Sequence, residues 1–173
     1  MPGYSEQECN ELRDQMKELE AANSRLFNEY MDLMDQEREL SNQLVSEQVA
    51  TQSALQKLHW QQRHVAGITQ ELRYCLENRP PGTCNEIQER LETAEEVEDQ
   101  FYEEAREHLD AVSNLQAMRC QIEEEMKQNQ TERQTNRDQI GDIRETMNGG
   151  HCGCWEDGGG DTGYPNWGSM PAM

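Results

Sequence analysis

Large apolar side chains are scarce in this chain, and their scarcity limits the folds that it can adopt. Only 34% of the 173 residues are hydrophobic, and only 6% are aromatic. A compact globular core needs more apolar mass than this, whereas a pair of long helices needs only one apolar stripe on each helix. Low hydrophobicity with high charge also fits a disordered chain. The regular spacing of apolar residues over 5–148 argues against disorder.

Positive charge and long apolar runs are also in short supply. Fifteen lysines and arginines stand against 35 acidic residues, which gives a net charge of −20. This charge repels nucleic acids and anionic lipid surfaces, so neither is an expected partner. No apolar run approaches the length of a membrane span, and the polar segment 1–15 has no signal-peptide pattern. The default expectation is therefore a cytoplasmic protein without membrane insertion.

Apolar residues recur at alternating steps of three and four along two segments, starting at Cys9 and at Cys84. This spacing places them on one stripe of a helix, as in the seam of a coiled coil. Prolines and a glycine separate the two stripes, and a glycine-rich segment without the repeat follows the second. The sequence predicts helix 1 over 5–79, a Pro-Pro-Gly turn over 80–83, helix 2 over 84–148 and a Gly/aromatic/Cys tail over 149–173.

Start and stop signals flank both predicted helices. Ser5 with Glu8, and Thr83 with Glu86, have the spacing of a capping box, in which two side chains satisfy free backbone N–H groups. The segment 148–150, Asn-Gly-Gly, is a typical helix C-terminal stop. We therefore expect each helix to begin at its capping box.

Folding the chain back at the prolines brings the two stripes face to face along their whole length. Apolar residues then meet apolar residues, and polar residues in the stripes also meet each other. The interpretation is an all-α fold, a long antiparallel two-helix coiled-coil hairpin with a Gly-rich non-helical C-terminal tail. Two rods with a linker, and a parallel dimer, are the alternatives. The facing pairs are Cys75 with Cys84, Leu58 with Phe101, Leu12 with Met147, Asn23 with Asn136, Gln61 with Glu98 and Thr51 with His108, and a Glu37–Arg119 contact is feasible.

Apolar residues beside the seam indicate a protein partner. A two-helix seam cannot cover all of them, so we expect a partner helix or self-association into a four-helix assembly. The alternative is that they only thicken the seam. The aromatic residues of the tail suggest a docking peptide, a disordered end or a segment packed near Tyr4 and Cys9. The candidate partner-binding residues are Phe27, Met34, Leu55, Tyr102, Leu109, Trp155, Tyr164 and Trp167, with Leu76, Val97 and Met118 also beside the seam.

The six cysteines allow several interpretations. Cys75 and Cys84 face each other beside the turn, either as a disulfide or as two small reduced core residues. Cys9 falls opposite position 150, beside His151 and Cys152, so a second disulfide from Cys9 to Cys152 or Cys154 is a candidate. If disulfides form, the protein belongs to an oxidising compartment or an exterior assembly. Cys120 is interpreted as a buried inert thiol or an intermolecular link. The set Cys9, His151, Cys152 and Cys154 could alternatively hold zinc, although its spacing is tighter than usual.

No catalytic motif or phosphate-binding glycine loop is present, so an enzyme and a resident cofactor are not expected. The favoured hypothesis is a non-enzymatic structural coiled-coil protein, acting as a spacer, scaffold or assembly subunit. The alternatives are a metal- or redox-responsive binding protein that uses the Cys/His cluster, and a holdase-like chaperone that grips clients along the apolar flank.

Overall fold

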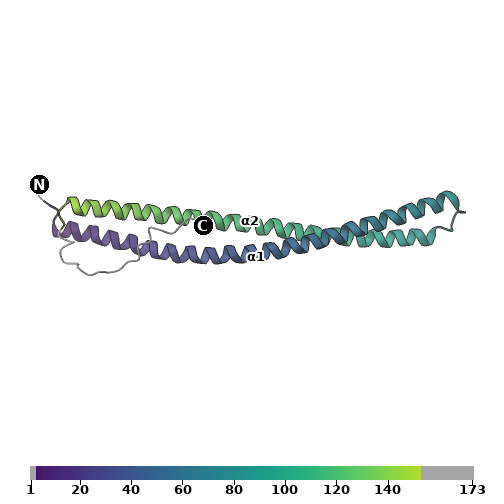
Figure 1. Ribbon diagram of the computed structural model, residues 1–173, viewed down its shortest axis with the longest axis horizontal. Helices are drawn as coiled ribbons and strands as arrows, with labels where there is room; N and C mark the ends of the chain where they lie inside the picture. Colours follow the sequence, from purple (N-terminus) through teal and green to yellow (C-terminus); the bar gives the residue numbers. More distant parts are fainter. Residues whose placement is uncertain (1–2, 153–173) are drawn as a thin grey trace. The chain divides into compact units, whose positions relative to one another are not determined.

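Two long α-helices make up almost all of the computed structural model, which describes residues 3–152 (Figure 1). Helix α1 runs from Glu6 to Asn78 and helix α2 from Asn85 to Gly149. None of the described residues is in a β-strand. The expectation of an all-helical protein with two long helices that pack against each other is confirmed.

The chain divides into two compact units, and each contains one part of α1 and one part of α2. Unit 1 comprises residues 1–29 and 129–173, and unit 2 comprises residues 30–128. Contacts between the helices run in opposite directions along the chain within each unit. In unit 2, for example, Glu71 contacts Arg90, whereas Lys57 contacts Glu104. The helices are therefore antiparallel in both units.

The start of α1 has the capping box that its sequence predicts. The Ser5 backbone N–H donates a hydrogen bond of 2.7 Å to Glu8 Oε2, and the Glu8 N–H donates one of 3.3 Å to Ser5 Oγ. The hydrogen bonds from Ser5 favour the ionised carboxylate, and they hold the pKa of Glu8 below its ordinary value. This pair fixes the first residue of the helix.

The predicted capping box at the start of α2 is wrong. Thr83 Oγ1 donates a 2.7 Å hydrogen bond to the Pro80 carbonyl, and the Thr83 N–H donates to the same oxygen at 3.3 Å. Thr83 thus closes the turn, and Gly82 adopts a φ of 89° that favours glycine. The helix begins after Cys84, whose carbonyl accepts the Gln88 N–H at 3.1 Å. Thr83 therefore lies one position before the N-cap residue, Cys84, so Thr83 and Glu86 do not have the positions of a capping box in this helix.

The end of α2 is a Schellman motif whose left-handed residue is a histidine. His151 has a φ of 55°, and the Cys152 N–H donates a 3.1 Å hydrogen bond to the Met147 carbonyl. The Gly150 carbonyl accepts the Tyr4 N–H at 2.8 Å, and a Cβ on Gly150 would lie 1.6 Å from the Tyr4 ring. The two glycines that precede His151 therefore serve helix termination and close packing, and the left-handed position falls one residue later.

Each unit has a small core in the predicted seam. In unit 2, Ala54 and Ala105 are each 2% exposed and pack with Leu58 and Phe101. The two alanines let the helix backbones approach closely, because neither side chain extends beyond Cβ. The predicted facing of Leu58 with Phe101 is confirmed. The core of unit 1 contains Cys9, Met147 and Cys152, packed by Leu12 and Ile143.

Candidate functional site

A disulfide joins the start of α1 to the segment after α2 in unit 1. Cys9 and Cys152 are bonded, with their Cα atoms 5.7 Å apart, and their side chains are buried. The Schellman motif sets the direction of Cys152, since its N–H returns to Met147 in the same buried cluster. Residues 143 positions apart in the chain are thereby linked. This is one of the pairs that the sequence puts forward.

A second disulfide closes the turn in unit 2. Cys75 and Cys84 are bonded, with a Cα–Cα distance of 6.0 Å, and Cys75 is 1% exposed. The loop between them is short and contains the Pro-Pro-Gly turn. The bond reaches across the seam because both cysteines occupy facing stripe positions beside the turn.

The proposed zinc ligands are only partly brought together. Cys9 and Cys152 bind each other, so neither sulfur is the thiolate that zinc requires. His151 is exposed beside them, and Cys154 lies outside the described residues. Across residues 3–152, no group of three or more His, Cys, Asp or Glu side chains is arranged to hold a metal. Metal binding at this end would require the disulfide to be reduced first.

The interpretation of Cys120 as a buried thiol is wrong. Its side chain is exposed, and it is the one free cysteine within the described part of the chain. Cys120 follows the stripe residue Arg119 by one position, which turns its side chain about 100° away from the seam. A thiol at this position is open to solvent and to neighbouring molecules.

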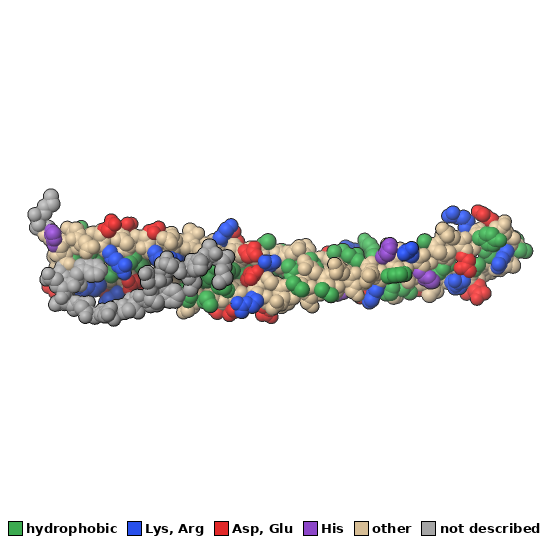
Figure 2. Space-filling view, in the orientation of Figure 1, with side chains coloured by type: hydrophobic (Ala, Val, Ile, Leu, Met, Phe, Trp, Pro, Cys, Tyr) green, Lys and Arg blue, Asp and Glu red, His purple; other side chains and the backbone are tan. Residues whose placement is uncertain are grey.

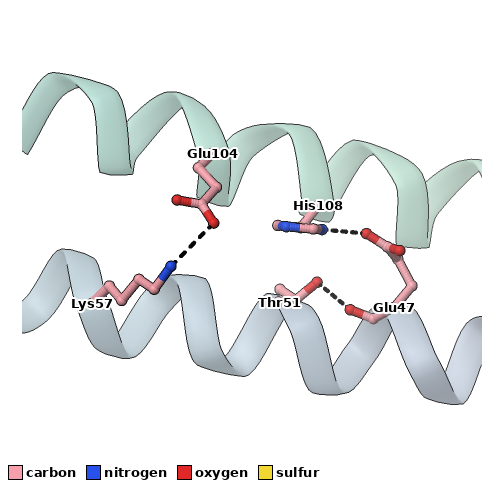
Figure 3. A network of polar contacts seen from close by, with 5 residues as sticks. All are labelled: Glu47, Thr51, Lys57, Glu104 and His108. Atoms are coloured by element: carbon pink, nitrogen blue, oxygen red, sulfur yellow. Dashed lines mark hydrogen bonds and ion pairs between the residues drawn. The ribbon is translucent and has the colours of Figure 1, made fainter.

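Polar groups of the seam in unit 2 are paired across the helices. Glu37 Oε1 accepts the Arg119 Nε–H at 3.1 Å, so the contact expected from the sequence is present. His108 Nδ1 contacts Glu47 Oε1, while Thr51 Oγ1 donates to the Glu47 carbonyl of its own helix (Figure 3). The predicted pairing of Thr51 with His108 is therefore replaced, because the longer Glu47 side chain reaches the imidazole and the hydroxyl is used locally.

The expected pairing of Gln61 with Glu98 is also replaced in unit 2. The Gln61 amide donates a 2.9 Å hydrogen bond to the Ala94 carbonyl instead of reaching a side chain. The small alanine exposes its backbone carbonyl to the opposite helix, so a long amide side chain can reach it.

Three amide side chains interrupt the apolar seam of unit 1, and all three form hydrogen bonds across the helices. Asn136 Nδ2 donates to Asn23 Oδ1 at 2.9 Å, which confirms the predicted facing pair. Asn23 in turn donates to the Arg133 carbonyl at 3.2 Å, and the buried Asn129 donates to the Leu26 carbonyl at 2.7 Å. These bonds occur at one register only, since a slip of either helix would leave buried amides without partners.

One flank of unit 2 exposes the apolar residues that the sequence marks as partner-binding. Leu55, Tyr102 and Leu109 are 43%, 55% and 47% exposed. Helical spacing places all three on the side away from the Lys57–Glu104 ion pair, next to the Ala54–Ala105 layer. We call Leu55, Tyr102 and Leu109 the apolar flank. These three side chains are open to solvent. Hydrophobic groups also reach the surface elsewhere along this unit (Figure 2).

The other partner-binding candidates have different environments. Phe27 is 39% exposed, and Arg133 lies over its ring at 5.6 Å from the centroid. Met34 is half-buried, so it contributes partly to the seam. The proposed docking residues of the tail, Trp155, Tyr164 and Trp167, lie outside the described residues.

Sequence reasoning missed several exposed apolar residues because they occupy positions far from the seam. Trp60 and Tyr74 are 65% and 63% exposed on α1. Their spacing of fourteen residues, two seven-residue repeats, puts them on one outer face, and this is the signal that could have found them. Met31, Val45 and Val49 are exposed as well.

The chain was compared with protein-family models, with curated proteins and with solved structures. No protein-family model matches the chain, and no significant similarity to a curated protein or to a solved structure was found. Neither helix within the described residues combines the length and the apolar character that crossing a bilayer requires.

Proposed function

We propose that the protein is a non-enzymatic structural protein, an antiparallel coiled-coil hairpin that serves as a spacer, scaffold or assembly subunit. The observation that carries this proposal is the apolar flank of unit 2, formed by Leu55, Tyr102 and Leu109 beside a closed seam. Because the seam is already filled by the chain's own helices, the flank is available to helices of other molecules. Helices with an apolar stripe, including those of a second copy, are the matching partners.

Fixed register supports the role of a scaffold. The two disulfides and the paired polar groups each specify one alignment of the helices, as Glu37 with Arg119 and Asn23 with Asn136 illustrate. A molecule with one register presents its surface residues at constant spacings. Constant spacing is what a spacer or an assembly subunit needs.

The distribution of reactive side chains supports a non-catalytic role. His59 and His64 are exposed on α1, and His108 contacts Glu47 in the seam. The open depression around Leu40 and Met118 is lined by amides and apolar groups, with one carboxylate. Such a lining offers no nucleophile paired with a base.

Sedimentation velocity on a double variant tests the assembly role. Leu55→Glu with Leu109→Glu places two charges on the apolar flank, and we expect higher assemblies to dissociate while the far-UV circular dichroism stays helical. The matched control is Gln56→Glu with Asn114→Glu, which adds the same charge at exposed outer positions and should leave association unchanged. A parent protein that stays monomeric at high concentration contradicts the proposal.

A redox- or metal-responsive binding protein is the second candidate, favoured by disulfides in both units and by the free thiol of Cys120. Opening Cys9–Cys152 would release thiolates beside His151. Zinc that binds to the reduced protein and is lost in Cys152→Ser would support this function. A reduced protein that binds no zinc and keeps the helicity and the association state of the oxidised form would exclude it.

We also propose an oxidising compartment or an exterior assembly as the location, in place of the default cytoplasm. Both disulfides support this placement, because reducing cytoplasm rarely retains structural disulfides. Thiol blocking before digestion, followed by peptide mass mapping of protein from its native source, tests it. Linked peptides containing Cys75 and Cys84 are expected, and blocked thiols at both positions would contradict the placement.

A further inference from the structure

Unit 1 carries a row of basic side chains along one flank of an otherwise acidic protein. On α1, Arg13, Lys17 and Glu20 follow each other at steps of four and three residues and therefore share a face. On α2, Arg137 and Arg144 are seven residues apart and share a face as well. Four basic groups stand there against two acids, Glu20 and, seven residues before Arg13, Glu6.

An ion pair brings the two rows side by side. Arg144 Nη2 lies 3.7 Å from Glu20 Oε1, so the row on α2 runs next to the row on α1. Glu20 is therefore paired with Arg144. Arg13, Lys17 and Arg137 form no ion pair with any of the described residues. We call Arg13, Lys17, Arg137 and Arg144 the basic flank.

The opposite flank of unit 1 has the reverse charge. One arginine, Arg25, stands there against six acids, which are Glu8, Glu11, Glu18, Glu29, Glu132 and Asp142. Unit 1 is thus electrostatically two-sided, although the whole chain has a net charge of −20. A positive surface in such a protein favours an acidic binding partner, and the acidic surface of a second copy competes with any acidic segment of the same chain.

The segment that begins beside the basic flank has the complementary composition. Residues 153–173 contain three acids, Glu156, Asp157 and Asp161, and no lysine or arginine. They also contain Trp155 and Trp167. Indole rings bind guanidinium groups through cation–π contacts, and unit 1 already has one such contact between Arg133 and Phe27.

The attachment point puts this segment within reach of the flank. Cys152 is bonded to Cys9, which lies one helical turn, about 6 Å, from Arg13. Arg137 lies 15 residues before Cys152, about 20 Å along the helix from this attachment point. The general relation for glycine-rich linkers gives 21 residues a root-mean-square reach of about 25 Å, which is enough to cover the whole basic flank. Attachment at this distance gives an effective concentration on the order of millimolar.

We propose that residues 153–173 bind the basic flank of unit 1 in the same molecule. The three carboxylates pair with Arg13, Lys17 and Arg137, and the indole rings lie against guanidinium faces. Gly141, between the two arginines of α2, leaves open space on this flank that a flat ring can enter. The contact masks the aromatic tail, and rising ionic strength or an acidic competitor releases it. This inference does not depend on the role of the apolar flank, since it concerns unit 1 and the tail alone.

Tryptophan quenching in the full chain tests the proposal. Trp60→Phe leaves Trp155 and Trp167 as the only tryptophans, and the acrylamide quenching constant then reports the exposure of the tail. At low salt we expect a quenching constant severalfold below that of a free peptide with the sequence 153–173, and a rise toward the peptide value at high salt. The triple reversal Arg13→Glu, Lys17→Glu and Arg137→Glu should give the peptide value at all salt concentrations.

Two controls separate specific contact from general charge or misfolding. Lys17→Glu and Arg25→Glu change the charge equally, but only Lys17 lies on the basic flank, so only its variant should raise the quenching constant. Helicity by circular dichroism must be unchanged in every variant. Changing the three tail acids to lysine in the triple-reversal background should restore protection, because the charges are complementary again.

The outcomes that overturn the proposal are clear. A quenching constant equal to that of the free peptide at low salt, or one that the triple reversal leaves low, shows that the flank does not hold the tail. Protection that disappears on dilution assigns the occupant of the flank to a second copy, and the intramolecular contact is then wrong.

Discussion

Unit 1 and unit 2 are built from the same two helices, yet they differ in what they place in the seam and beside it. Unit 1 has three asparagines, Asn23, Asn129 and Asn136, in an otherwise mostly apolar seam, and it has basic residues along one flank. Unit 2 has an alanine–leucine core and exposes Leu55, Tyr102 and Leu109. Amides set register at the expense of apolar burial, whereas an apolar flank offers burial to other molecules. One fold thus carries two kinds of surface, one electrostatic and one apolar.

The disulfides give the largest expected difference between the units. The Cys9–Cys152 bond spans 143 positions and the Cys75–Cys84 bond spans 9. Loop-closure entropy predicts a loss of about 5 kcal/mol of unfolding free energy for Cys9→Ser with Cys152→Ser, and about 3 kcal/mol for Cys75→Ser with Cys84→Ser. Urea unfolding followed by circular dichroism measures both. Equal losses of unfolding free energy would mean that the disulfides do not act mainly by reducing the conformational entropy of the unfolded chain.

The alanine layer of unit 2 gives the next effect. Ala105→Leu inserts a larger, branched side chain into the buried layer of Ala54, Leu58 and Phe101, and we expect a loss of about 1–3 kcal/mol in unfolding free energy. The matched control is Ala117→Leu at an exposed position of the same helix, which should change stability by less than about 0.5 kcal/mol. The difference in thermal unfolding between these two variants measures how tightly unit 2 is packed. An Ala105→Leu variant as stable as its control would show that the layer has room.

The helix starts give the smallest effect and a pH dependence that only α1 should show. The pKa of Glu8 is lowered by its hydrogen bonds with Ser5, so the capping box adds stability above the ordinary pKa of 4.5 and loses it as pH falls through the lowered value. Glu8→Gln should remove this part of the pH dependence. The thermal stability of the parent and of the variant is measured above and below the lowered pKa of Glu8. If the two proteins show the same dependence of stability on pH, the capping role of Glu8 is contradicted. Thr83, which closes the turn before α2, has no ionisable group.

The spacing of residues in the sequence predicted several contacts correctly, both within one helix and directly across the seam. The capping box of Ser5 and Glu8, the Asn23–Asn136 pair and the Glu37–Arg119 contact were all predictable, because helical spacing alone places those atoms in reach. The Thr83 capping box failed because Cys84 is the N-cap residue and the Thr83 hydroxyl closes the turn before it. His108 found Glu47 and not Thr51, since side-chain length and competition for a carbonyl decide such contacts.

The candidate surfaces were predictable only in part. Leu55, Tyr102 and Leu109 stand out in the sequence as apolar residues next to the seam, and they are exposed in the structure. Cys120 was placed wrongly, because the interpretation relied on the general tendency of free cysteines to be buried and not on its position one residue outside the stripe. The basic flank was not recognised at all. Its residues come from two distant segments, and the net charge of −20 hides them.

The sequence by itself determined the all-helical class and the two long helices, because the apolar stripes repeat with the helical period and prolines interrupt them once. The tertiary structure decided which residues across the two helices touch, that His151 rather than a glycine takes the left-handed position, and that four basic residues form one flank. The physical reason is that the spacing of apolar residues in the sequence determines which face of a helix is buried. Contacts between helices also depend on side-chain reach, on competition for shared acceptors and on the alignment of segments more than 100 residues apart, such as Asn23 and Asn136.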